Sequence, residues 1–224
     1  ATMMLEGNYD AYVSHFKKSI DNYGGSYSDP DFHNWTYNTD NDWYDQMLRT
    51  ALITNHSLSI AGGSDKTTYS LGGSYLYQDG IMDVDNNYKR LNFRAAVDYN
   101  ATNWLKVGFN GVFSQSEQQV PNNAAWQKAF NCPPIVALYD KNNDKAFPNK
   151  YGSPDVLGYS SNFYNPIAFA EYYDSKNESY QALTNFYAQI DFIPNKLNLR
   201  SNYSYSFLST QGREFTPAYY VSSW

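Results

Sequence analysis

The sequence predicts an all-β fold, a sector of a transmembrane antiparallel β-barrel with long loops at one end, and three observations lead to this prediction. Apolar and polar residues alternate with a period of two in several segments, as in a strand with two different faces. These segments run for about ten to fourteen residues, whereas strands of soluble domains usually have about five or six. Short and long connections also alternate between the segments, as they do in outer-membrane barrels.

The composition is compatible with a barrel and argues against a protein with transmembrane helices and against a nucleic-acid-binding protein. Of the 224 residues, 42% are hydrophobic and 17% are charged, and the mean hydropathy is −0.65. The sequence has no run of about eighteen apolar residues, so it predicts no transmembrane helix. Aromatic residues make up 18% of the chain, which suits membrane interfaces or sugar-binding surfaces. The net charge of −6 argues against a nucleic-acid partner, which needs a basic surface.

The single cysteine and the start of the chain each limit the interpretation. Cys132 is the only cysteine, so an intrachain disulfide cannot form, and no nearby Cys/His pattern marks it as a nucleophile. The residues from Ala1 to Leu5 do not begin a signal peptide, although a barrel strand requires export. We therefore expect the sequence to be an excerpt from a longer chain.

Residues 1–53 are expected to form an extracellular loop region with a short helix. Residues 5–20 place their apolar side chains near one face of a helix. Residues 22–42 are rich in Gly, Ser, Asn and Asp, which predicts a loop. The pattern leaves open whether residues 43–48 form a helical turn or the start of a strand.

Four strands are predicted between residues 54 and 118. The clearest pattern lies in residues 88–100, where Leu91 belongs to an apolar set at odd positions and Arg90 to a polar set at even positions. A hairpin-like turn at residues 63–66 joins the first two strands. The four predicted strands are residues 54–63, 67–78, 88–100 and 103–119.

The alternation breaks at residues 119–178, which we expect to form a long extracellular loop. Connections of this length are rare in compact domains and are usually functional. Residues 124–130 predict a short helix that Pro133 and the proline after it terminate. Two further barrel strands are expected over residues 179–209, and residues 210–224 are expected to begin the next extracellular loop.

Several short motifs follow one another along the chain. They are Asp42-Trp43, Leu48-Arg49-Thr50-Ala51, Asn55-His56-Ser57-Leu58-Ser59-Ile60-Ala61-Gly62-Gly63-Ser64, Lys66-Thr67-Thr68-Tyr69, Tyr75-Leu76-Tyr77-Gln78-Asp79-Gly80-Ile81, Tyr88-Lys89-Arg90, Asn165-Pro166, Leu197-Asn198-Leu199-Arg200-Ser201-Asn202 and Pro217-Ala218-Tyr219-Tyr220. In their order, these motifs resemble those of SusC/RagA-type TonB-dependent outer-membrane transporters. The resemblance covers most of the chain from Leu5 onward.

The resemblance implies a barrel of about 22 strands, of which this chain would hold roughly the second to the seventh. It also implies a plug domain inside the barrel, a Ton box that contacts the TonB complex, and a SusD-like surface lipoprotein that closes the barrel. The implied function is TonB-dependent import of a bulky nutrient, a glycan or a peptide, across the outer membrane of a Gram-negative bacterium. Neither a cofactor nor a metal ion is expected.

The alternation predicts which side chains face the lipid bilayer and which face the barrel lumen. Charged lumen residues suit contact with a substrate or the plug, although solvation and plug packing explain any single one more simply. Outward tyrosines fit an interface girdle better than a sugar platform. The predicted lumen-facing residues are Arg90, Arg94, Asp98, Lys106 and Arg200. The predicted lipid-facing residues are Tyr69, Leu71, Leu91, Phe93, Val97, Val107, Phe109, Leu199 and Tyr203.

The long loop contains aromatic residues that no strand pattern explains. Aromatic rings stack on sugar and peptide surfaces, but they also serve loop packing and partner interfaces, so all three explanations stay open. The candidates for contact with a ligand or with the lipoprotein lid are Trp126, Phe130, Tyr139, Tyr151, Phe163 and Tyr164.

Two other functions are weaker alternatives. An outer-membrane barrel enzyme needs an acid, base or nucleophile set, and His15, His33 and His56 are too widely separated to suggest one. We therefore expect no enzyme activity. A secreted carbohydrate-binding β-sandwich would have shorter strands without a continuous outward face of tyrosines.

Overall fold

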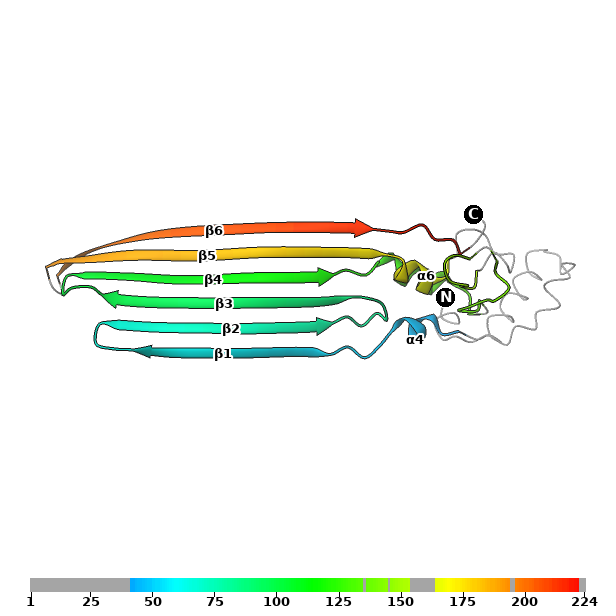
Figure 1. The fold of residues 1–224 in the computed structure, drawn as a ribbon, viewed down its shortest axis with the longest axis horizontal. Helices are drawn as coiled ribbons and strands as arrows, with labels where there is room; N and C mark the ends of the chain where they lie inside the picture. The colour runs from blue at the N-terminus through cyan, green and yellow to red at the C-terminus, as the bar shows by residue number, and fades with distance from the viewer. Residues whose placement is uncertain (1–40, 135, 145, 154–163, 194–195, 222–224) are drawn as a thin grey trace, which may run out of the picture.

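The described part of the chain forms one open antiparallel sheet of six strands, with helices and loops gathered at one end (Figure 1). The computed structural model describes residues 41–134, 136–144, 146–153, 164–193 and 196–221. The helix predicted at residues 5–20 and almost all of the loop predicted at 22–42 lie outside these residues. The strands are β1 (Ile53–Gly63), β2 (Thr67–Asp79), β3 (Asn87–Asn100), β4 (Leu105–Gln119), β5 (Asp174–Ile193) and β6 (Leu197–Phe215).

Each strand pairs with its neighbour in the sequence, in the order β1-β2-β3-β4-β5-β6. The predicted all-β fold with an antiparallel six-stranded sector is confirmed. The sheet does not close, so β1 and β6 have unpaired outer edges among the described strands. An edge of this length needs a further strand or a cover, because its backbone groups are otherwise left without partners.

The last two strands are longer than the sequence predicted. β5 begins at Asp174 and β6 ends at Phe215, whereas the alternation suggested limits at Ser179 and Ser209. Apart from Gly212 and the terminal Phe215, the added residues are polar on both faces. The hydrophobic period therefore disappears while the backbone ladder continues, as in the pair Lys176–Arg213. Hydrophobic alternation therefore measures the extent of the apolar face and underestimates the extent of backbone pairing.

Three short helices of the described residues lie at the loop end of the sheet: α4 (Trp43–Met47), α5 (Ala124–Asn131) and α6 (Pro166–Glu171). The segment that the sequence left undecided is thus a helical turn. Asp42 caps α4 by accepting hydrogen bonds from the backbone N–H groups of Tyr44 and Asp45. The predicted helix α5 is confirmed, and it ends at Cys132 before two prolines. No helix in the described ranges is long and apolar enough to cross a membrane.

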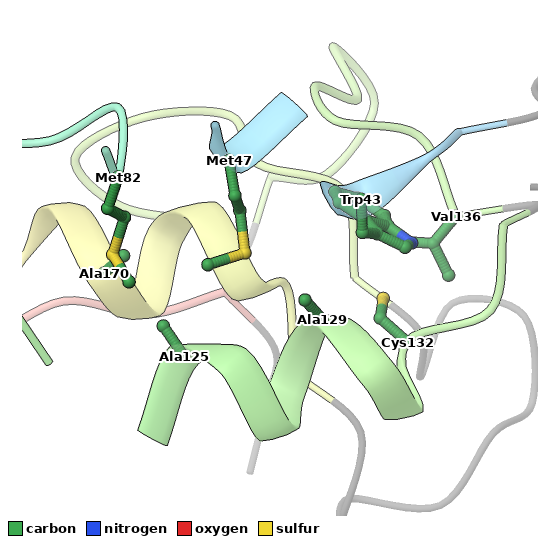
Figure 2. Packing of buried hydrophobic residues seen from close by; sticks show 8 residues of the cluster. All are labelled: Trp43, Met47, Met82, Ala125, Ala129, Cys132, Val136 and Ala170. Atoms are coloured by element: carbon green, nitrogen blue, oxygen red, sulfur yellow. The ribbon is translucent and has the colours of Figure 1, made fainter. Parts of the chain in front are cut away.

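These helices share a hydrophobic core, which Figure 2 shows. Trp43 is 1% exposed and donates a hydrogen bond from Nε1 to the Pro133 carbonyl at 3.0 Å. Met47 and Met82 point into the space beside α5 and α6. The complete cluster is Trp43, Met47, Met82, Ala125, Ala129, Cys132, Val136 and Ala170. We call the helices and connections around this core the loop-end body.

Candidate functional site

The sheet has two faces of different chemistry, and its register assigns every strand residue to one of them. Residues directly opposite each other on neighbouring strands share a face. Arg94 lies opposite Gly72 and Val112, whereas Phe93 lies opposite Gly73 and Phe113. Extending these pairs places all five predicted lumen-facing residues on one face and all nine predicted lipid-facing residues on the other. We call them the polar face and the apolar face.

The polar face is tied together by a network centred on Asn92. Its side-chain amide donates to Ser74 on β2 at 3.0 Å, and its Oδ1 accepts from Ser114 on β4 at 2.7 Å. Arg90 Nε also donates to Asn92 Oδ1 at 2.8 Å. These bonds link three strands in one register, because a slip of one residue would send the side chains to opposite faces.

A second assembly on the polar face brings two predicted residues together through Tyr187, which no sequence pattern marks as a site residue. The Tyr187 hydroxyl donates to Asp98 Oδ1 at 2.6 Å, so its side chain crosses over β4. It crosses at Gly108, where a Cβ atom would overlap the ring. The Arg200 guanidinium lies 3.9 Å from the ring centroid, within cation–π distance. Only the strand register reveals this assembly, because its members are far apart in the sequence.

The apolar face carries a band of limited height. On β4 the apolar stretch from Leu105 to Phe113 runs about 27 Å along the strand, at about 3.4 Å per residue. A strand tilt of about 40° lowers this to a height of about 20 Å, close to the apolar band of about 25 Å in outer-membrane barrels. No described segment covers this band: Leu58 is 81% exposed and Tyr203 is 65% exposed. The face therefore needs an apolar environment.

Charged side chains replace the apolar ones toward the loop end of the same face. Glu117 lies between Lys89 and Lys176, at 3.8 Å and 3.0 Å, and Lys176 also pairs with Glu178 at 2.9 Å. Beside them, Arg213 pairs with Asp174 at 2.6 Å. This change from an apolar to a charged surface is what a strand meets where it leaves lipid for water.

The predicted loop aromatics do not form a single site. Tyr151 is 1% exposed, with its ring 5.0 Å from the Tyr139 ring and 6.0 Å from the Tyr172 ring. For Tyr151 the structure therefore supports the loop-packing explanation. Tyr139 itself is 59% exposed at the edge of this cluster. Phe163 lies outside the described residues.

The remaining aromatic candidates lie elsewhere in the loop-end body. Trp126 is half-buried and stacks on Tyr44, with centroids 6.0 Å apart. Tyr164 is exposed beneath the Lys128 ammonium group, which lies 4.2 Å from the ring centroid. Phe130 is exposed near the end of α5. Among the described rings, no stacking contact joins these three residues to the Tyr139 cluster.

The loop-end body includes the segment after β6, a connection that no sequence pattern indicates. Asn143 is 4% exposed, and its side-chain amide donates to the carbonyls of Tyr151 and Val221 at 2.8 Å and 2.9 Å. Phe147 and Tyr220 exchange two backbone hydrogen bonds in an isolated bridge. The long loop and this later segment are therefore one folded unit.

Burial and nearby charges shift the pKa values of several ionisable groups in the loop-end body. Burial raises the pKa of the Cys132 thiol far above its usual range, which makes it a packing residue at neutral pH. Burial also raises the pKa of Glu171. Lys150, 2.8 Å away, lowers the pKa of Asp144. The described residues contain no group of three or more His, Cys, Asp or Glu side chains placed to hold a metal ion.

The sequence of this chain is similar to those of known proteins. TonB-dependent receptor P3 of Formosa agariphila is 31% identical over 179 residues, which cover 79% of this chain. TonB-dependent receptor SusC of Bacteroides thetaiotaomicron is 30% identical over 120 residues, or 52% of this chain. This chain is of the SusC/RagA type of TonB-dependent transporter. No family model matches it.

Solved structures of RagAB show the same fold as this SusC/RagA-type chain. The RagAB peptide importer in its closed-closed state superimposes with a TM-score of 0.59 at 21% identity, covering 82% of this chain and 21% of that one. A structure of the RagAB peptide transporter gives a TM-score of 0.58 at 24% identity over 95% of this chain and 23% of that one. The chain also spans only 18% of the length of receptor P3 and 12% of that of SusC.

Proposed function

We propose that this chain forms part of the wall and extracellular loops of a TonB-dependent transporter that imports a bulky nutrient across the outer membrane. One observation carries the proposal: six consecutive strands share a continuous apolar face that no described segment covers. In an outer-membrane barrel, lipid covers that face. The similarity to proteins named TonB-dependent receptors supports the same function.

The two ends of the sheet then have different environments. Tight turns join the strands at one end, and long connections form the loop-end body at the other (Figure 1). In bacterial barrels the short turns are periplasmic and the long loops extracellular, so the loop-end body lies outside the cell. There it would meet a SusD-like lipoprotein, while a plug and Ton box elsewhere in the full protein would contact the TonB complex.

The polar face would line the path of the nutrient. Arg90, Arg94, Asp98, Lys106 and Arg200 would then contact water, the plug or the passing ligand. Three of them already have partners on the wall: Arg90 binds Asn92, and Asp98 and Arg200 hold Tyr187. Arg94 and Lys106 make no hydrogen bond or ion pair with another described side chain, so they are the freer contacts for plug or ligand.

The alternative functions gain no support from the fold. A sandwich would need a second sheet packed on the apolar face, and the described strands form a single sheet. For a barrel enzyme, no observation in the described part of the chain favours a catalytic set. A glycan and a peptide both remain suitable cargo for the transporter as a whole.

Peptide mapping of a detergent-solubilised outer-membrane fraction tests the proposal. We expect the native chain that bears these residues to be several times heavier than 25.7 kDa and to copurify with a surface lipoprotein. Deleting its gene should abolish growth on one polymeric nutrient. A complete soluble chain of this size would contradict the transporter function and favour the carbohydrate-binding sandwich.

A further inference from the structure

A pocket opens on the polar face at its loop end, with a volume of about 630 Å³. This volume lies within the usual range of about 300–1,000 Å³ for ligand pockets. We call it the rim pocket. Its main polar and aromatic lining residues are Gln78 of β2, Tyr88 of β3, Gln118 of β4, Trp126 of α5 and Asn123, which precedes α5.

Three of these residues form a straight row across the sheet. Gln78 lies directly opposite Tyr88, and Tyr88 lies directly opposite Gln118. Adjacent strands are about 4.8 Å apart, so the phenol of Tyr88 stands between two side-chain amides on the same face. This spacing suits a ligand that offers an apolar surface flanked by hydrogen-bonding groups.

Some polar side chains of the rim pocket have protein partners, since Asn87 donates to Asp85 and Gln119 donates to Asp174, but others have none. No hydrogen bond to another described residue satisfies the side chains of Gln78, Gln118 or Asn123. Asn123 precedes α5 at the N-cap position, yet its side chain makes no capping bond. Asn86 also lines the pocket; it is 3% exposed, and its Oδ1 has no hydrogen-bond partner. Buried acceptors of this kind normally find a partner, so the site has unused bonding capacity.

The described lining of the rim pocket offers no net charge to a ligand. No lysine, arginine or histidine is among the described residues that line it. Among these described residues the one carboxylate belongs to Asp79, which already accepts a hydrogen bond from Arg49 at 2.7 Å within an ion pair. A charged ligand group would therefore lose hydration without gaining an opposite charge.

The walls of the rim pocket are held in place before any ligand arrives. Met82 lines the pocket and belongs to the core of the loop-end body, where it is 2% exposed (Figure 2). Trp126 packs against the same core and stacks on Tyr44. Preformed walls lower the ordering cost of binding.

We propose that the rim pocket binds a neutral sugar unit of the incoming nutrient. Side-chain amides offer both donors and acceptors to sugar hydroxyls, and the rings of Tyr88 and Trp126 can pack on the apolar face of the sugar ring. The inference rests on the proposed function, which places this face in the path of the nutrient. It deepens that function by favouring a neutral glycan over a peptide or an acidic polysaccharide.

The test uses the full-length transporter, purified in detergent with its lipoprotein. Binding is measured by calorimetry with neutral gluco-, manno-, xylo- and galacto-oligosaccharides, with a casein-digest peptide pool and with sulfated oligosaccharides. We expect at least one neutral saccharide to bind. Gln118→Ala and Tyr88→Ala should each raise its Kd about tenfold, the usual effect of losing one good contact.

Gln115→Ala is the matched control, because Gln115 lies on the same strand but on the opposite face. We expect its Kd to stay within about twofold of the wild-type value. Trp126→Phe, read by the loss of ligand-dependent tryptophan fluorescence change, gives a second readout. Heat-modifiability on gels checks that each variant forms an intact barrel.

Three outcomes would overturn the inference: no neutral saccharide binds, binding is unchanged in both rim-pocket variants, or these variants lose peptide or sulfated-sugar binding instead. Each can occur in a protein that still inserts into the membrane and supports nutrient uptake, so the proposed function would survive. Failure of the native chain to appear in the outer membrane would remove the proposed function itself.

Discussion

The sheet and the loop-end body are stabilised in opposite ways. The loop-end body buries Trp43, Met47 and Ala125 to within 1% of full burial, and its side chains form a core of their own. The sheet has long backbone ladders but leaves Leu58 and Leu199 at 81% and 58% exposure. The loop-end body buries its apolar side chains against one another, whereas the apolar face of the sheet depends on an apolar environment outside the described chain.

This difference shows how one chain is adapted to two solvents. In lipid, a strand needs its backbone bonds satisfied and its outward side chains apolar, and it needs no protein core on that side. In water, a loop keeps a defined shape only if it buries apolar side chains of its own. The boundary between the two regions lies where the apolar face gives way to the Lys89, Glu117 and Lys176 group.

The largest expected effect separates the core of the loop-end body from the sheet. Trp43→Ala should destabilise the loop-end body by about 3–5 kcal/mol, since a buried Trp is lost. We expect limited proteolysis to cut the loops of this variant while the strands stay protected in the membrane. Trp104→Ala, at an exposed turn on the opposite end, is the control and should change little. Simultaneous loss of loops and strands would show that the two regions are not independent.

Charge on the apolar face should have the next largest effect. Phe93→Arg should cost about 2–4 kcal/mol near the middle of the bilayer and block barrel assembly, measured by heat-modifiability in outer-membrane fractions. Leu183→Arg makes a similar change on the polar face at almost the same level, since its neighbour Ala182 pairs with Phe113. That control should assemble. Normal assembly of Phe93→Arg would contradict the assignment of the two faces.

A smaller effect is expected at the connection between the long loop and the segment after β6. Asn143→Ala leaves two buried carbonyls without their donor, at a cost of about 1–3 kcal/mol. Hydrogen exchange should become faster around Tyr151 and Val221, with no change in β1–β6. The exposed neighbour provides the control, Asn142→Ala, for which we expect wild-type exchange. Unchanged exchange in Asn143→Ala would show that the Phe147–Tyr220 bridge holds the segment alone.

The smallest expected effect concerns the reactivity of the Cys132 thiol toward maleimide. Cys132 is fully buried and burial raises its thiol pKa, so maleimide should not label the folded protein at neutral pH but should label it after denaturation. Phe130→Cys places a second thiol at an exposed position of α5 and should be labelled without denaturation. Rapid labelling of Cys132 in the native protein would mean that the core of the loop-end body opens readily.

Much of the sheet could be predicted because its signal is local. The alternation around Leu91 and Phe93 identified the strands and sorted their side chains into two sets that the register keeps on separate faces. The helix α5 was predictable for a similar reason, since Pro133 marks its end within a few residues. The polar ends of β5 and β6 were missed because pairing continues there without any hydrophobic pattern.

The sequence by itself determined the alternating parts of the strands, the short turns and the chemistry of each face, because a period of two is visible in neighbouring residues. The tertiary structure alone decided which distant residues meet. Tyr187 reaches Asp98 only because Gly108 lies between them. Asn143 donates a hydrogen bond to Val221, which lies 78 residues further along the chain. The row from Gln78 to Gln118 likewise exists only once the register is set. Register and loop packing depend on many weak contacts between segments that are remote in the sequence, and a local sequence pattern does not predict such contacts.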